Sequence, residues 1–96
     1  MPYYVILGNW TEEGIRTVKN GPKREEAFKK AVDAAGGKVV VSLHTMGKYD
    51  IVAVVELPSD DAANTVALRD GQQGFVRTTT LKGWTSIEFA QLVQRL

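Results

Sequence analysis

The stretch that most constrains this chain is the run from Lys38 to Leu57, KVVVSLHTMGKYDIVAVVEL. Its two apolar segments, 39–43 and 51–55, are rich in β-branched residues and lack helical spacing. Such side chains favour strands, where they pack well on a pleated surface. Gly47 can adopt the positive φ of a short hairpin, which predicts a tight turn at Gly47-Lys48. Because both segments are apolar at successive positions, we expect the hairpin to be buried on both faces.

Five other segments carry strand or helix patterns. Residues 3–10 and 75–81 are rich in apolar, aromatic and Thr residues, which predicts strands. Residues 23–35 and 59–70 carry apolar side chains at helical spacing, and Ser59 is expected to be the N-cap of the second of these helices. Residues 85–96 open with a Thr-x-x-Glu capping box before another apolar stripe. The order is therefore β-α-β-β-α-β with a C-terminal helix. It predicts one α+β, ferredoxin-like domain with a four-stranded antiparallel sheet for the whole chain.

The turn residues of the first helical region suggest where its helices begin and end. Thr11 is suited to cap a short helix, and Gly21 followed by Pro22 is expected to end it. In the next helix the charged residues between Lys23 and Asp33 are expected to face solvent. The mixed signs of this charged run argue against a phosphate-binding surface.

The two strands predicted at the centre of the sheet, 3–10 and 51–55, are apolar on both faces. In a ferredoxin-like fold the helices cover one face, so the other would be exposed on a monomer. We therefore expect a homodimer in which two such faces pack together as a dimeric α+β barrel. The C-terminal helix would either clasp the partner or cover its own sheet. A trimer built from the same unit, as in PII-like proteins, is the alternative assembly.

Composition limits the classes of function. The net charge is +1, which gives no bulk attraction to nucleic acid or to an anionic membrane. Cysteine is absent, which excludes disulfides and thiolate chemistry and fits a reducing compartment. No basic leader precedes the first strand, and no apolar run approaches the ~20 residues of a spanning helix. We expect a cytoplasmic protein, and the sequence identifies no cofactor.

His44, the only histidine, is the first candidate for chemistry. If the hairpin places His44 opposite Ile51, the imidazole shares a face with Ser42 and Ala53, which is compatible with the open side of the sheet. There it could serve as a general base, or as a haem or metal ligand, inside the barrel. The alternative is a half-solvated histidine at a strand edge, because a lone His lacks the partners of a metal site.

Asp50 and Tyr49, which follow the predicted turn, have two interpretations each. Asp50 could orient His44 or a ligand hydroxyl across the hairpin. Turn stabilisation is the commoner role, in which Asp50 accepts hydrogen bonds from turn amides and Tyr49 packs beside the loop. The sequence leaves both open.

The ends of the outer strands supply the remaining candidates. Trp10, after Asn9, could wall a pocket at the barrel mouth or seal the end of the core. Arg77 either reaches solvent from an edge strand or pairs with an anion in a cleft. The predicted site has two catalytic residues, His44 and Asp50. Its predicted binding residues are Asn9, Trp10, Ser42, Tyr49 and Arg77.

Several of these segments resemble the GYD-domain family, short bacterial proteins named for a Gly-Tyr-Asp signature. The signature positions here are Gly47, Tyr49 and Asp50, with Lys48 inserted after the glycine. The other matching segments are Thr11–Ile15, Gly21-Pro22 with Arg24, and Gly36-Gly37. The resemblance covers nearly the whole chain and implies the dimeric α+β barrel group. That group includes small monooxygenases, muconolactone isomerase and haem-binding chlorite dismutases, so the fold selects no activity.

Three functions remain open on the sequence. The first is a small homodimer that binds an apolar or aromatic small molecule in the barrel without turnover. The second is a cofactor-free enzyme, monooxygenase-like or isomerase-like, with His44 or Asp50 as base. The third is an assembly- or stress-related dimer without a pocket. A cavity that joins His44, Asp50 and Arg77 would favour the enzyme, and a filled interior would favour the third.

Overall fold

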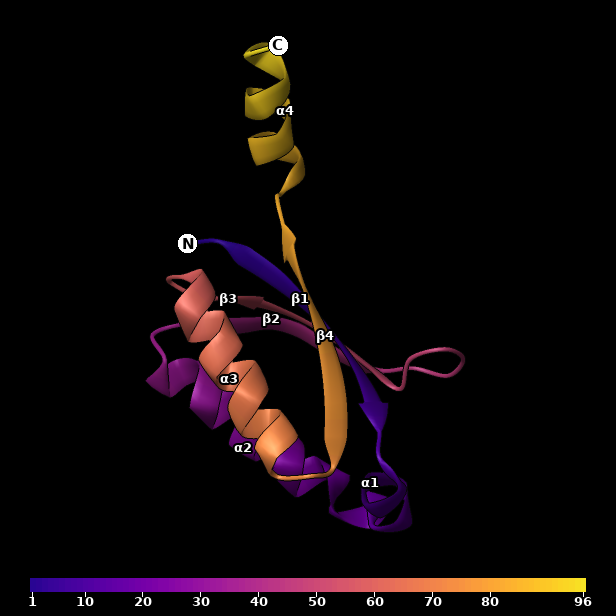
Figure 1. Cartoon of the computed structure of the whole chain (residues 1–96). Coiled ribbons are helices and arrows are strands. Elements are labelled where there is room, and N and C mark those ends of the chain that lie inside the picture. The colour runs from indigo at the N-terminus through magenta and orange to yellow at the C-terminus, as the bar shows by residue number, and fades with distance from the viewer.

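The computed structural model describes all 96 residues, and its elements follow the predicted order (Figure 1). The first half contains β1 (Tyr3–Trp10), α1 (Glu12–Arg16), the 3-10 turn η1 (Val18–Asn20), α2 (Gly21–Ala34) and β2 (Lys38–His44). The second half contains β3 (Ile51–Glu56), α3 (Asp60–Gln72), β4 (Val76–Gly83) and α4 (Ser86–Gln94). None of the helices combines the length and the apolar character that a membrane crossing requires.

The four strands form one antiparallel sheet in the order β2-β3-β1-β4. As predicted, β1 and β3 are the central pair, and β2 and β4 are the edges. Helices α2 and α3 lie side by side over one face of this sheet (Figure 1). The α+β, ferredoxin-like fold class predicted from the sequence is thereby confirmed.

The core lies between the sheet and the two long helices. On the sheet side, Tyr4 pairs with Val55 and Ile6 pairs with Ala53, and all four side chains are buried. The core cluster consists of Tyr4, Ile6, Val32, Ala53, Val55, Leu57, Ala63 and Val66. The small Ala63 on α3 lets that helix approach the sheet closely, because packing distance depends on the side chains at the contact.

The opposite side of the sheet, which we call the open face, is also apolar. Its apolar residues alternate with those of the core and follow from the strand register: Tyr3, Val5, Leu7, Val41, Leu43, Val52, Val54 and Leu81. The same register places the polar Thr79, opposite Leu7, on this side of β4. The central side chains are half-buried, whereas Val41, Leu43 and Leu81 on the edge strands are 41%, 52% and 49% exposed. No element of this chain covers the face, in agreement with the predicted one-sided placement of the helices.

The capping predictions for three helices are confirmed. Thr11 accepts a hydrogen bond from the amide of Gly14, and Ser59 accepts one from the amide of Ala62. Thr85 and Glu88 form the reciprocal capping box of α4. These side chains satisfy amides that have no partner within the first turn of a helix.

The prediction that Gly21-Pro22 ends a helix is wrong, because α2 begins there. Gly21 has a helical φ of −53°, and Pro22 occupies the first turn of α2. A first-turn amide has no partner inside the helix, so the missing N–H of proline costs nothing there. The first helical region instead ends through Thr17 and the 3-10 turn η1.

The tight turn predicted at Gly47-Lys48 is a wider loop of residues 45–50. The loop closes through a 2.8 Å hydrogen bond from the Thr45 amide to the Asp50 carbonyl, and the Thr45 hydroxyl donates to the Tyr49 carbonyl at 2.6 Å. Gly47 does adopt a positive φ, 107°. Because these bonds hold the loop, His44 lies opposite Ile51 in the register that was expected.

Two predicted boundaries also shift near the end of the chain. Helix α3 continues through Gly71 to Gln72, and the reversal comes at Gly74, whose φ is 85°. Strand β4 accordingly runs from Val76 to Gly83 and not over 75–81. A helical glycine lowers stability without ending a helix, and the left-handed φ is what requires glycine.

Candidate functional site

A small cavity lies between the core-facing side of the sheet and the helices α2 and α3. Its volume is about 60 Å³. Its walls include Ile6, Trp10, Glu25, Phe28, His44 and Phe75. The lining combines aromatic and aliphatic groups with polar side chains from α2, β2 and α3, as in many ligand pockets. The volume is nevertheless well below the ~300–1,000 Å³ of pockets that hold drug-sized ligands.

Three polar side chains meet at this cavity. Ser42 Oγ on β2 donates a 2.7 Å hydrogen bond to Glu25 Oε1 on α2. His44 Nε2 lies 3.5 Å from the other carboxylate oxygen of Glu25. The imidazole also stacks on the Trp10 indole, with the ring centroids 6.2 Å apart and the planes 13° from parallel. We call Glu25, Ser42 and His44 the polar cluster.

The pKa values of two carboxyl groups at the cavity, Glu25 and Asp70, are shifted in opposite directions. The hydrogen bond from Ser42, with a further contribution from His44, holds the pKa of Glu25 below its usual value against the opposing effect of burial. Burial raises the pKa of Asp70, which lines the cavity from α3. Separated carboxyl pKa values are a feature of acid–base sites, and they also occur in structural pairs.

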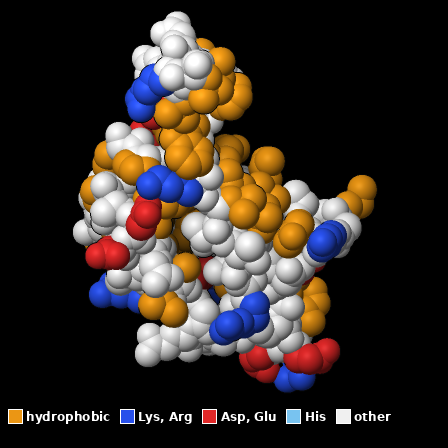
Figure 2. Space-filling view, turned by 45° about the horizontal axis from the view of Figure 1, so that its top comes forward, with side chains coloured by type: hydrophobic (Ala, Val, Ile, Leu, Met, Phe, Trp, Pro, Cys, Tyr) orange, Lys and Arg blue, Asp and Glu red, His pale blue; other side chains and the backbone are white.

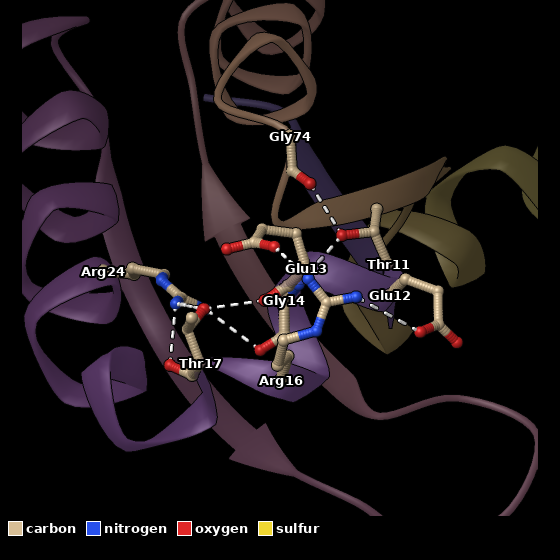
Figure 3. Close-up of polar contacts among 8 residues, drawn as sticks. All are labelled: Thr11, Glu12, Glu13, Gly14, Arg16, Thr17, Arg24 and Gly74. Carbon is tan, nitrogen blue, oxygen red and sulfur yellow. Dashed lines mark hydrogen bonds and ion pairs between the residues drawn. The ribbon is translucent and has the colours of Figure 1, made fainter.

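The sequence placed the charged residues of α2 on its solvent side, and the structure differs for two of them, Glu25 and Arg24. Arg24 is half-buried, with its guanidinium 3.9 Å from the centre of the Phe75 ring. It donates to the carbonyl oxygens of Gly14 and Thr17 and to the Thr17 hydroxyl (Figure 3). The planar, multidentate guanidinium thus joins α1 to α2 and closes one side of the cavity.

His44 lies on the face that the helices cover, not on the open face. The register fixes this placement, because Ile51 opposite His44 also pairs with Gly8, whose side of β1 carries the buried Ile6. Ser42 follows the same alternation. The sequence alone did not distinguish the two faces, because both are apolar.

The structure brings together His44, Ser42 and Trp10 from the predicted site. Asp50 does not line the cavity, and its carboxylate instead accepts a 2.9 Å hydrogen bond from the backbone amide of Trp10. Tyr49 lies in the hairpin loop, where the Lys48 ammonium is 5.7 Å from the centre of the Tyr49 ring.

The two remaining predicted binding residues also lie outside the cavity. The Asn9 side-chain amide donates to the Lys48 carbonyl at 2.7 Å and so fixes the hairpin loop against β1. Arg77 is exposed on the edge strand β4, where it lines a surface depression together with residues of α3. Neither side chain is positioned to meet a ligand held beside His44.

Glu25 is the residue that sequence reasoning missed. It lies three residues before Phe28 and seven before Val32, so it falls on the apolar stripe of α2. A carboxylate on an apolar stripe is the signal that could have indicated it. No group of three His, Asp or Glu side chains forms a metal site, and a cavity of about 60 Å³ does not accommodate haem.

The fold and these contacts define a small α+β, ferredoxin-like protein with a bare sheet face and one polar cluster, in which the His44 side chain at the edge of the sheet is 50% exposed. The chain belongs to the GYD domain family, whose model matches residues 4–93. It is 35% identical, over 100% of its length and 99% of the relative's, to a Thermus thermophilus protein named glutamine synthetase and cystathionine beta-lyase binding protein. It also resembles the crystal structure of the protein TTHA0845 from Thermus thermophilus. The TM-score is 0.56 at 22% identity, covering 90% of this chain and 96% of that one, which supports the fold.

Proposed function

We propose that this chain is a homodimeric binding protein without catalytic turnover, and that its partners are other proteins, in the first place enzymes. The observation that carries the proposal is the open face, which presents apolar side chains from all four strands to solvent. Stable protein interfaces need such surface, and exposed apolar patches of several hundred Å² are unusual on monomers.

Pairing of two open faces is the arrangement that removes this surface from water. Face-to-face packing of antiparallel sheets buries the half-exposed valines and leucines in a layer ~10 Å thick. The face is self-complementary because it carries apolar side chains on all four strands, as an isologous twofold contact requires. Figure 2 shows hydrophobic side chains on the body of the molecule between the base of α4 and the hairpin loop.

Support for protein partners comes from the Thermus thermophilus relative, which matches this chain end to end and is named as a binding protein for two enzymes. The interior cavity also favours protein partners over a small-molecule substrate. The cavity is too small for a substrate of ordinary size, and it does not join His44 to Asp50 or Arg77. A dimer presents each of its binding surfaces twice, which strengthens attachment to an oligomeric enzyme through multivalency.

The oligomeric half of the proposal is tested by light scattering coupled to size exclusion at micromolar concentration. The wild type should run as a dimer, and Val54→Lys at the centre of the open face should run as a monomer. Val18→Lys is the matched control, because Val18 is a 41% exposed valine in η1, away from the open face. A monomeric wild type, or a dimeric Val54→Lys variant, contradicts pairing through this face.

The partner half is tested with purified enzymes. Glutamine synthetase and cystathionine β-lyase from the organism in which the chain occurs are immobilised, and binding is followed by biolayer interferometry with bovine serum albumin as control. Saturable binding to at least one enzyme is expected. Equal signals on both enzymes and on albumin would remove these enzymes as partners.

A second candidate function rests on the polar cluster. Glu25 and His44, walled by Trp10, could bind a small apolar or aromatic molecule, or act as the base of a monooxygenase-like or isomerase-like reaction. Asp50 is a weaker candidate for that base, because its carboxylate already binds the Trp10 amide. Thermal shift with small aromatic ligands tests the candidate: stabilisation of the wild type and not of His44→Ala supports it, and equal shifts remove His44 from a direct role.

A further inference from the structure

Helix α4 stands clear of the rest of the molecule. It continues in the direction of β4 beyond the end of the sheet, with only Trp84 and Thr85 between them (Figure 1). It packs extensively against no other helix or strand, and none of its residues is buried. The sequence left open whether this helix covers its own sheet, and the structure shows that it does not.

One side of α4 is apolar from Phe89 to the last residue, Leu96. Phe89, Leu92, Val93 and Leu96 recur at helical spacing and are 61%, 37%, 45% and 104% exposed. The opposite side carries Gln91 and Gln94 together with Ile87. An isolated helix of fewer than ~12–15 residues is marginal in water, so a helix of this length needs a surface against which its apolar side packs.

We infer that the apolar side of α4 packs on a second copy of this chain, as part of the dimer proposed above. The inference deepens that proposal and rests on it. Each chain offers one uncovered sheet face and one uncovered helix, so a single twofold contact removes both from water at once. If α4 did not pack on the second copy, a dimer formed through the sheet faces alone would still expose two apolar helices, one on each chain. Hydrophobic side chains follow α4 down to the body of the molecule (Figure 2).

The area that a stable dimer needs favours this arrangement. Four strands spaced about 4.8 Å apart, with about seven residues rising 3.3 Å each, give the open face a footprint on the order of 450 Å². Standard interfaces bury ~800 Å² on each partner. The arm from Trp84 to Leu96, about 20 Å long and 10 Å wide as a helix, adds on the order of 200 Å². The two flat footprints together come to roughly 650 Å², and the accessible area that they bury is larger, so the sheet face and the arm together reach the size of a standard interface.

The first experiment measures the dimer dissociation constant by sedimentation velocity over a dilution series. Phe89→Gln combined with Leu92→Gln keeps helix-forming residues while removing two apolar contacts, and should weaken the dimer on the order of 100-fold. The matched control is Ile87→Gln with Ala90→Gln, which removes apolar side chains off the contact side and should change the constant less than about threefold. Equal weakening by the two pairs overturns the inference.

A second experiment remains decisive if these variants disturb folding. A photo-crosslinking benzoylphenylalanine at position 89 should give a covalent species of twice the chain mass on irradiation, and the same group at Gln91 should not. A crosslink confined to one chain means that α4 folds onto its own sheet and overturns the inference. A wild-type dimer with no crosslink from position 89 overturns it as well. If the α4 experiments fail but Val54→Lys still converts the dimer to a monomer, pairing through the open face stands and only the role of α4 is overturned. A monomeric wild type overturns both proposals.

Discussion

The carboxylate of Glu25 lies 3.5 Å from the imidazole of His44, although one residue belongs to α2 and the other to the edge strand β2. Ser42 supports the pair by donating to the same carboxylate. The contact joins the helical layer to the sheet beside the cavity. It also places the lone histidine of the chain on the helix-covered side, where sequence patterning did not assign it.

The lowered pKa of Glu25 predicts a pH-dependent contribution to stability. A carboxyl whose folded-state pKa is depressed contributes stability above its unfolded value, and this contribution is lost as the pH falls through the folded value. Ser42→Ala should lower the free energy of unfolding by about 1.5 kcal/mol near pH 7. Urea denaturation should show that this difference shrinks as the pH falls below the ordinary range of glutamate, because protonation removes the charge that the Ser42 hydroxyl stabilises. An unchanged difference would contradict the role of the Ser42 hydrogen bond.

Asp50 should behave as a structural residue. Asp50→Ala removes the acceptor of the Trp10 amide and should cost about 1–2 kcal/mol of unfolding free energy. Asp50→Asn keeps an acceptor oxygen and should cost less than half as much. Urea denaturation of the two variants measures this ratio. Equal costs would show that the charge, and not the hydrogen bond to Trp10, is what matters.

Gly14 should resist substitution because its Cα faces the backbone of the segment before β4. A Cβ added there would lie 1.9 Å from the Phe75 carbonyl oxygen, so α1 would have to move. Gly14→Ala should destabilise the protein by roughly 1–3 kcal/mol, the range for overpacking. Gly21→Ala is the control, since its Cβ would meet nothing closer than 4.0 Å and its φ is helical. Thermal unfolding of both variants should show a loss for Gly14 only.

Tyr4 should titrate apart from the other two tyrosines. Burial, together with the hydrogen bond to Asp60 and its charge, raises the pKa of Tyr4 from 10.0 to about 12. Because folding favours the protonated phenol, the associated stability is fully present below pH 10 and is lost as the pH rises toward 12. The ultraviolet absorbance of tyrosinate should show one late-titrating group that is absent from Tyr4→Phe. Three tyrosines that titrate together would contradict this prediction.

The sequence predicted strands and caps well where local chemistry decides them. The β1 segment from Tyr3 to Trp10 was predicted to the residue, and the caps at Thr11, Ser59 and Thr85 follow from side chains bonding to nearby amides. The prediction for Gly21-Pro22 is wrong because the pair is compatible with either end of a helix. The structure places it at the start of α2, which Arg24 joins to α1 through bonds to Gly14 and Thr17.

By itself, the sequence determined the order of the elements, the central strands, the family resemblance and the presence of two apolar sheet faces, because these follow from periodicity and turn chemistry along the chain. Only the tertiary structure decided which apolar face the helices cover, and with it the position of His44. It also brought Glu25 and Ser42 to that histidine, bonded Asp50 to the Trp10 amide outside the cavity lining, and left α4 without a surface on its own chain against which to pack. These outcomes depend on contacts between residues distant in sequence, which no local pattern records.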